Sequence, residues 1–296
     1  MDHARSTFDN DLALLPNLPD WITSGRTKTP EDAAFFSGAA LNHLHFVLGR
    51  DVIPHALLRE RLALRAVEAC VVRTGRPERA AELRDAVQFL QPGDRAGPAG
   101  ETYLCWQRAV QHRLSVKTLH RALPAHTPDA IACWLDVGQG AAVARAAMVL
   151  ETILTETPRS EGVALILADA ALARAFGWAH LVPLLATGMK RADLHRRGDD
   201  LRLACHHVLT SAAIDAVRLC SDLARRAAYL EAVAPKLRAK GAQKAVTLFM
   251  TRDAVAPAAL TSLRSDRAAR RFCDRLVALG AVRELTGRDT FRLYGL

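Results

Sequence analysis

Apolar residues recur every three or four positions through most of this chain of 296 residues. Hydrophobic residues make up 50% of the sequence and are mostly Ala, Leu and Val, whereas aromatic residues make up only 5%. A spacing of three to four places apolar side chains on one face of an α-helix, and Ala and Leu are strong helix formers. The pattern therefore predicts a mainly α-helical fold, in which Ala-rich faces let the helices approach closely.

Proline and glycine divide the chain into successive segments. Residues 1–30 are expected to form an irregular arm, and the charged stretch at 190–200 is expected to be a loop. Helices are predicted after Pro30 and at about 54–74, 78–90, 99–112, 115–123, 128–136, 140–156, 161–176 and 201–234. Because Pro235 and Gly241 break the chain again, the predicted domains are the arm (1–30), an all-helical domain (31–240) and a small C-terminal domain (241–296).

Residues 241–296 change from helical spacing to strand-like alternation. Three short helices are expected first, near Lys244, from Pro257 and after Ser265, which is a good N-cap residue. The segments AVREL and TFRLY are rich in β-formers and flank the turn-like TGRD, a pattern typical of a hairpin. In the second segment, Phe291 and Leu293 alternate with Arg292. Three helices followed by a hairpin predict a C-terminal winged-helix-like module.

Positive charge is concentrated in this module. Residues 241–296 hold ten Lys and Arg against five Asp and Glu, so they carry a net charge of +5 out of +9 for the chain. Excess positive charge favours phosphate-rich partners, and arginines on one face of a helix in the major groove can meet phosphates and guanine edges. The predicted DNA-binding residues are accordingly Ser265, Arg267, Arg270, Arg271, Arg275, Arg288 and Arg292.

Three interpretations of this arginine-rich face stay open at this point. The favoured partner is double-stranded DNA, which makes the protein a DNA-associated regulator or accessory factor. Winged helices also dock proteins, so a protein partner or a homodimer is the alternative, and a solvated structural cap is the third. An enzyme with a pocket in the helical domain is the least favoured function.

No residue pattern indicates catalysis, a metal or a cofactor. His43 and His45 are two apart, so they point in different directions on a helix. Cys205, His206 and His207 are consecutive and lack the spacing of three or four that helical metal sites use. The sequence also lacks a nucleophile elbow, a phosphate loop and a dinucleotide fingerprint. We therefore predict no catalytic residues, no metal ligands and no cofactor.

The sequence favours the cytoplasm. No apolar run approaches the roughly 18 residues that cross a bilayer, and the early acidic residues lack the apolar stretch of a secretory signal. The six cysteines are scattered singly through helix-like segments, which is typical of buried thiols in a reducing compartment. We expect no association with a membrane.

Several stretches resemble an uncharacterised family of alphaproteobacterial proteins that is met in rhizobia and their relatives. The most specific are SDRAARRFCDRLVALG with AVRELTGRDTFRLYGL, LALRAVEACVVRTGRPE, ELRDAVQFLQPGDRAGPAG, VAPKLRAKGA and DAVAP. The resemblance covers the chain from about residue 30 to its end and implies a bacterial cytoplasmic protein. It transfers no catalytic or ligand-binding residues. One departure, the short stretch between Leu260 and Ser265, compresses the corner between the second and third C-terminal helices.

Overall fold

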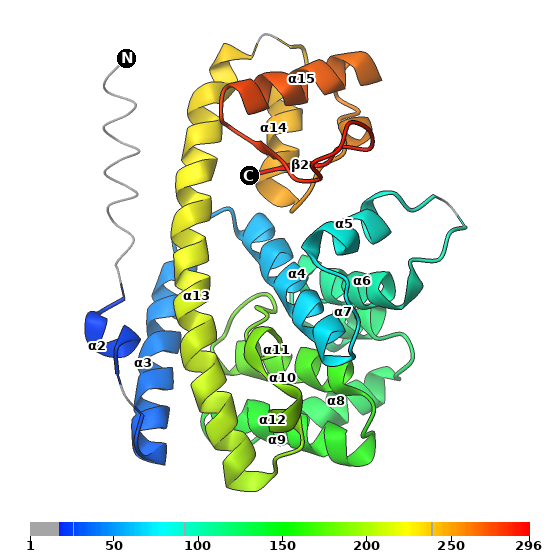
Figure 1. Ribbon diagram of the computed structural model, residues 1–296. Helices are drawn as coiled ribbons and strands as arrows, with labels where there is room; N and C mark the ends of the chain where they lie inside the picture. The colour runs from blue at the N-terminus through cyan, green and yellow to red at the C-terminus, as the bar shows by residue number, and fades with distance from the viewer. Residues whose placement is uncertain (1–17, 26, 92, 238) are drawn as a thin grey trace. The chain divides into compact units, whose positions relative to one another are not determined.

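The computed structural model describes residues 18–25, 27–91, 93–237 and 239–296 and is mainly helical (Figure 1). The mainly α-helical fold expected from the sequence is confirmed. The helices are α2 (Asp20–Thr23), α3 (Pro30–Leu48), α4 (His55–Arg73), α5 (Ala80–Gln88), α6 (Gly97–Gln111), α7 (Val116–Ala122), α8 (Pro128–Asp136), α9 (Ala142–Glu156), α10 (Glu161–Ala175), α11 (Leu185–Gly188), α12 (Arg191–Leu194), α13 (Gly198–Val233), α14 (Ala242–Thr251) and α15 (Asp266–Ala278), with 3-10 helices η1 (Ala234–Lys236) and η2 (Pro257–Ala259). The strands are β1 (Arg283–Glu284) and β2 (Tyr294–Gly295).

Apolar spacing and helix breakers located the long helices well. The helices expected at 54–74 and 201–234 are α4 and α13, whose ends lie within three residues of those bounds. Gly75, expected to end α4, has a φ of +77° and donates its N–H to the carbonyl oxygen of Val72. Glycine adopts this left-handed conformation without the strain that a Cβ atom imposes.

Two segments that were expected to be irregular are partly helical. The single turn α2 lies in the expected arm, whose residues 1–17 fall outside the described part of the chain. The single turn α12 lies in the charged stretch at 190–200, where the Asp193 carboxylate accepts the N–H of Lys190 at 3.2 Å. Such turns are too short to show an apolar period, so spacing alone does not reveal them.

The described residues divide into two compact units. One holds residues 18–46 and 62–217, and the other holds residues 47–61 and 218–296. α3, α4 and α13 each cross from one unit into the other. None of the described helices combines the length and the apolarity needed to span a bilayer.

In the larger unit, α10 packs against α9 and is buried along most of its length. Asp169 interrupts its apolar run and is itself fully buried. The carboxylate of Asp169 accepts the backbone N–H groups of Leu184, Leu185 and Ala186 at 3.2, 2.9 and 3.5 Å. Burial raises the pKa of Asp169 to about 7, although these three N–H groups act in the opposite direction. The buried carboxylate thus satisfies backbone donors at the start of α11, which have no partner within that helix.

The smaller unit has a core of its own. It contains Val246 and Phe249 of α14, Phe272 and Leu276 of α15, and Leu293, all of which are at most 5% exposed. Buried apolar side chains of this kind supply the main free energy that holds a small unit together.

An ion pair joins the C-terminal segment of this unit to α4. The guanidinium of Arg61 pairs with the carboxylate of Asp253, which is 2% exposed, and also donates to the carbonyl oxygen of Leu296 at 2.8 Å. The pair is therefore an internal link of the unit rather than a surface contact.

The hairpin expected over 281–285 and 290–294 is shorter than the sequence suggested. β1 and β2 pair antiparallel, with Arg283 opposite Gly295 and Glu284 opposite Tyr294. The carboxylate of Glu284 accepts the backbone N–H groups of Thr286 and Gly287, which follow β1, at 2.7 and 2.8 Å. A side chain that binds nearby backbone N–H groups competes with strand pairing, so the chain turns early.

Candidate functional site

α15 begins and ends at the residues that its sequence indicates. Ser265 is the N-cap residue, and its side-chain oxygen accepts the N–H of Ala268 at 3.3 Å. Asp266 lies in the first turn, where negative charge stabilises the helix dipole. Gly280, with a φ of +67°, follows the last turn. Both boundaries follow from ordinary capping chemistry.

The two sides of α15 differ sharply in chemistry. Ala269, Phe272, Cys273 and Leu276 form its buried face. The remaining positions are mostly exposed and include arginines in every turn. This division fixes the rotation of the helix about its own axis, because turning it would bury charge and expose the core residues.

Four of the predicted DNA-binding arginines lie on the exposed side of α15: Arg267, Arg270, Arg271 and Arg275. Within the described part of the chain, none of these four guanidinium groups forms an ion pair or a side-chain hydrogen bond. Asp266 and Asp274 are also exposed on α15 but lie beyond ion-pair distance of any described cation. The helix therefore presents several positive charges that the rest of the described protein does not neutralise.

The two predicted DNA-binding arginines of the hairpin are placed differently. The guanidinium of Arg288 donates to the carbonyl oxygens of Thr290 and Phe291. That of Arg292 donates to the carbonyl oxygen of Arg288 at 2.8 Å and approaches the carboxylate of Asp289 at 3.3 Å. A side-chain hydrogen bond with Tyr294 raises the pKa of Arg292, and the carboxylate of Asp289 raises it further by a smaller amount. Both side chains are half-buried and help to build the loop itself.

The alternation expected in the last strand breaks at Phe291. Leu293 is fully buried, whereas Phe291 is 72% exposed, although the two are two positions apart. Phe291 has a φ of +53° and lies before the paired strand begins, so the two-residue alternation of a strand does not apply to it. The expectation that Phe291 and Leu293 share a face was wrong for this reason.

A pocket in the smaller unit was not foreseen from the sequence. It has a volume of about 300 Å³ and is lined by Arg225, Arg226 and Tyr229 of α13, by Gly280–Arg283, and by Leu296. The hydroxyl of Tyr229 donates to the carbonyl oxygen of Leu279 at 2.8 Å. These residues come from segments more than 50 positions apart, so no local spacing could have brought them together.

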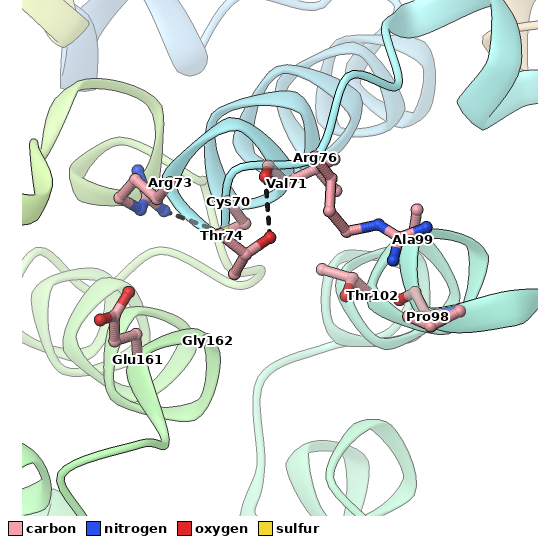
Figure 2. Close-up of a pocket in the computed structure, with 10 residues that line it drawn as sticks. All are labelled: Cys70, Val71, Arg73, Thr74, Arg76, Pro98, Ala99, Thr102, Glu161 and Gly162. Carbon is pink, nitrogen blue, oxygen red and sulfur yellow. Dashed lines mark hydrogen bonds between the residues drawn. The ribbon is translucent and has the colours of Figure 1, made fainter.

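A second pocket lies in the larger unit, at the end of α4 and the first turns of α6 and α10 (Figure 2). It has a volume of about 260 Å³. The guanidinium of Arg73 donates to the carbonyl oxygens of Ala186 and Met189 at 3.1 and 2.8 Å and to the Cys70 sulfur at 2.9 Å. Burial raises the pKa of the Cys70 thiol, which disfavours the reactive thiolate form.

Two of the histidines considered as metal ligands, His206 and His45, are engaged with neighbouring groups. The Nδ1 atom of His206 lies 2.6 Å from the hydroxyl oxygen of Ser37. The Nδ1 atom of His45 accepts the indole N–H of Trp178 at 3.0 Å. Burial lowers the pKa of His206. The described residues contain no group of three or more His, Cys, Asp or Glu that could hold a metal ion.

Comparison with known proteins places the chain in a family. No curated protein matches it at a significant level. The model of the family described as "Protein of unknown function (DUF1403)" matches residues 6–296. That match covers nearly the whole chain, including both units and α15, and the protein therefore belongs to the DUF1403 family.

Proposed function

We propose that the protein binds double-stranded DNA through α15, and that residues 241–296 act as a winged-helix module. The observation that carries the proposal is a set of exposed arginines on one short helix that have no ion-pair partner in the described part of the chain: Arg267, Arg270, Arg271 and Arg275. Arginine is the side chain best suited to phosphate, because its planar guanidinium offers two parallel N–H groups. We propose a role as a DNA-associated regulator or accessory factor.

The arrangement of the C-terminal elements supports this assignment. α14, η2 and α15 precede β1 and β2, which is the element order of a winged helix. An isolated antiparallel β-bridge between Val255 and Tyr294 places the segment after α14 alongside β2. In such a module the last helix enters the major groove and the hairpin lies near the adjacent backbone. In this module the bonds that Arg288 and Arg292 make within the loop hold the hairpin in shape.

Most of these contacts would position the protein without reading sequence. Arginines that meet phosphates fix register and orientation, and only contacts to base edges discriminate between sequences. The net charge of +5 over residues 241–296 supports association with any duplex. We therefore propose that affinity depends strongly on salt, with base contacts limited to a few residues of α15.

Replacing Arg270 and Arg271 with Ala tests this function. We expect the double variant to lose duplex affinity and to reduce the slope of log affinity against log salt by about 0.9 for each lost phosphate contact. Fluorescence anisotropy with a random-sequence duplex at two salt concentrations measures both quantities.

The matched control is the pair Lys244→Ala and Arg252→Ala, which removes the same charge from exposed positions outside α15. If the two double variants weaken binding equally, net charge rather than the α15 face explains the affinity, and the proposal fails.

A protein partner is the second candidate, and Phe291 favours it. An aromatic side chain that is 72% exposed at the hairpin is a typical anchor for a protein interface. This version predicts that affinity purification recovers a partner after nuclease treatment, and that Phe291→Ala abolishes the recovery. Recovery that disappears with nuclease alone contradicts it.

We also propose that the protein acts in the bacterial cytoplasm. The resemblance to alphaproteobacterial proteins suggests the source. All six cysteines are free thiols in the structure, and four of them are buried. Unpaired buried thiols are typical of a reducing compartment. Thiol labelling of the protein isolated from its native cells under denaturing conditions checks this, because six labelled cysteines are expected.

A further inference from the structure

The pocket beside the end of α15 combines positive charge with a concave surface. Three arginines line it: Arg225 and Arg226 from α13, and Arg283 from β1. Its volume of about 300 Å³ lies at the lower end of the range for small-molecule sites. A site of this size holds one compact polar group rather than a large ligand.

The charges in the pocket are only partly compensated. The Asp222 carboxylate pairs with both Arg225, at 2.6 Å, and Arg226, at 2.8 Å. One carboxylate thus serves two guanidinium groups. Arg226 uses its Nε in this pair, and its two terminal nitrogens form no hydrogen bond or ion pair with the residues that the structure describes. Arg283 is exposed, and it forms no side-chain hydrogen bond or ion pair with any residue that the structure describes. An excess of positive charge therefore remains at the pocket.

Tyr229 gives the pocket a fixed wall. Tyr229 is 48% exposed, and its hydroxyl donates to the carbonyl oxygen of Leu279, the residue that follows α15. The following residue, Gly280, turns the chain so that Ala281 and Val282 continue the lining. The pocket is thus formed by α13 on one side and by the turn between α15 and β1 on the other.

We infer that this pocket binds a phosphate group. Phosphate carries up to two negative charges and three strong acceptor oxygens, which match several convergent guanidinium groups better than a single carboxylate does. The inference deepens the proposed function and partly rests on it, since the pocket adjoins the helix proposed to enter the groove. The phosphate comes either from the backbone of bound DNA or from a free phosphorylated molecule.

Arg283→Ala is the variant that separates these sources. The side chain of Arg283 has no hydrogen-bond or ion-pair partner among the described residues, and Ala keeps the backbone pairing with Gly295, so the substitution should leave the fold intact. Arg252→Ala is the matched control, because Arg252 is exposed in the same unit and does not line the pocket. Titrations of the full chain with inorganic phosphate and with adenosine monophosphate by calorimetry, and with a random duplex by anisotropy, give three affinities for each variant.

A free phosphorylated ligand predicts that the wild-type protein binds phosphate or the nucleotide, and that Arg283→Ala weakens this binding about tenfold or more while Arg252→Ala does not. A DNA phosphate predicts that only duplex affinity falls, again in Arg283→Ala alone, together with a smaller salt slope. If Arg283→Ala matches Arg252→Ala in all three titrations, the inference is overturned.

Failure of the inference and failure of the proposed function are distinguishable. If the double variant Arg270→Ala and Arg271→Ala loses duplex binding and Arg283→Ala does not, the DNA phosphate is excluded from the pocket while the role of α15 in DNA binding is supported. If the wild-type chain binds phosphate but no duplex, the inference about the pocket is supported and the proposed DNA-binding function is contradicted.

Discussion

α10 and α15 are helices of similar length that differ in whether their ionisable side chains are buried or exposed. The middle of α10 (164–173) is buried on all sides, and Asp169, the ionisable residue within that stretch, lies in the core against three backbone N–H groups. α15 is buried on one side only, and its four arginines face outward without a partner in the described structure. The carboxyl group of Asp169 is thus satisfied by the protein, whereas the arginines of α15 are left for solvent or another molecule.

This difference separates structural charge from functional charge. A buried carboxylate that loses its position leaves backbone donors without partners, so it is under a structural constraint. An exposed arginine that loses its guanidinium costs the fold almost nothing. Substitutions in α10 should therefore change stability, and substitutions on the outer side of α15 should change binding.

The largest expected effect on stability is that of Asp169→Ala. It leaves the N–H groups of Leu184, Leu185 and Ala186 buried without an acceptor, and we expect it to lower the free energy of unfolding by about 3 kcal/mol or more. Asp136→Ala is the control, because its surface pair with Arg174 should contribute less than about 1 kcal/mol. Chemical denaturation measures both, and equal losses would contradict the structural role of Asp169.

The next effect is a pH dependence that Asp169 imposes. Its pKa of about 7 in the folded protein lies above that of an unfolded aspartate, so the folded state holds the proton more tightly. Stability from this group is therefore complete at low pH and falls as pH rises toward 7, by at most about 1.4 kcal/mol per pH unit.

Asp169→Asn removes this titration. The difference in unfolding free energy between the wild-type protein and the variant, measured from pH 5 to pH 8, should change in favour of the variant as pH rises. A difference that stays constant over this range shows that Asp169 does not titrate there.

A smaller effect is expected at the N-cap of α15. Ser265→Ala removes the acceptor for the N–H of Ala268 and should cost about 1 kcal/mol. Ser265→Gly should cost only a few tenths of a kcal/mol, because glycine is tolerated at this position. Thermal unfolding distinguishes the two, and equal losses from both variants would mean that the cap hydrogen bond is not what holds the helix end.

The smallest effect on stability is expected for Arg270→Ala combined with Arg271→Ala. Both side chains are exposed and unpaired within the described residues, so the change in unfolding free energy should stay within about 0.5 kcal/mol per substitution. Denaturation of the same preparation that is used for duplex binding checks this. A loss well above that range would assign these arginines to the fold and erase the contrast between α15 and α10.

The parts of the fold that depend on local chemistry were predictable from the sequence. The end of α4 at Gly75, the cap at Ser265 and the apolar face of α15 all follow from residues within one or two turns of each other. The outward position of Arg270 and Arg271 follows from the same spacing, because the opposite face carries Phe272 and Leu276.

Features that depend on distant residues were not predictable. The role of Asp169 requires the backbone of Leu184–Ala186, and the pocket at Arg283 requires α13. The engagement of Arg288 and Arg292 within the hairpin depends on a loop conformation in which Phe291 has a positive φ. Spacing along the chain carries no information about such contacts, so an arginine held by carbonyl oxygens and a free arginine look alike in sequence.

The measurement that tests the central claim most directly is the salt dependence of duplex binding by the wild-type chain. Four arginines on α15 that each replace a counterion predict that log affinity falls with log salt concentration with a slope of about −3 to −4. A slope near zero, or no binding to a random duplex at low salt, would contradict the assignment of α15 to DNA.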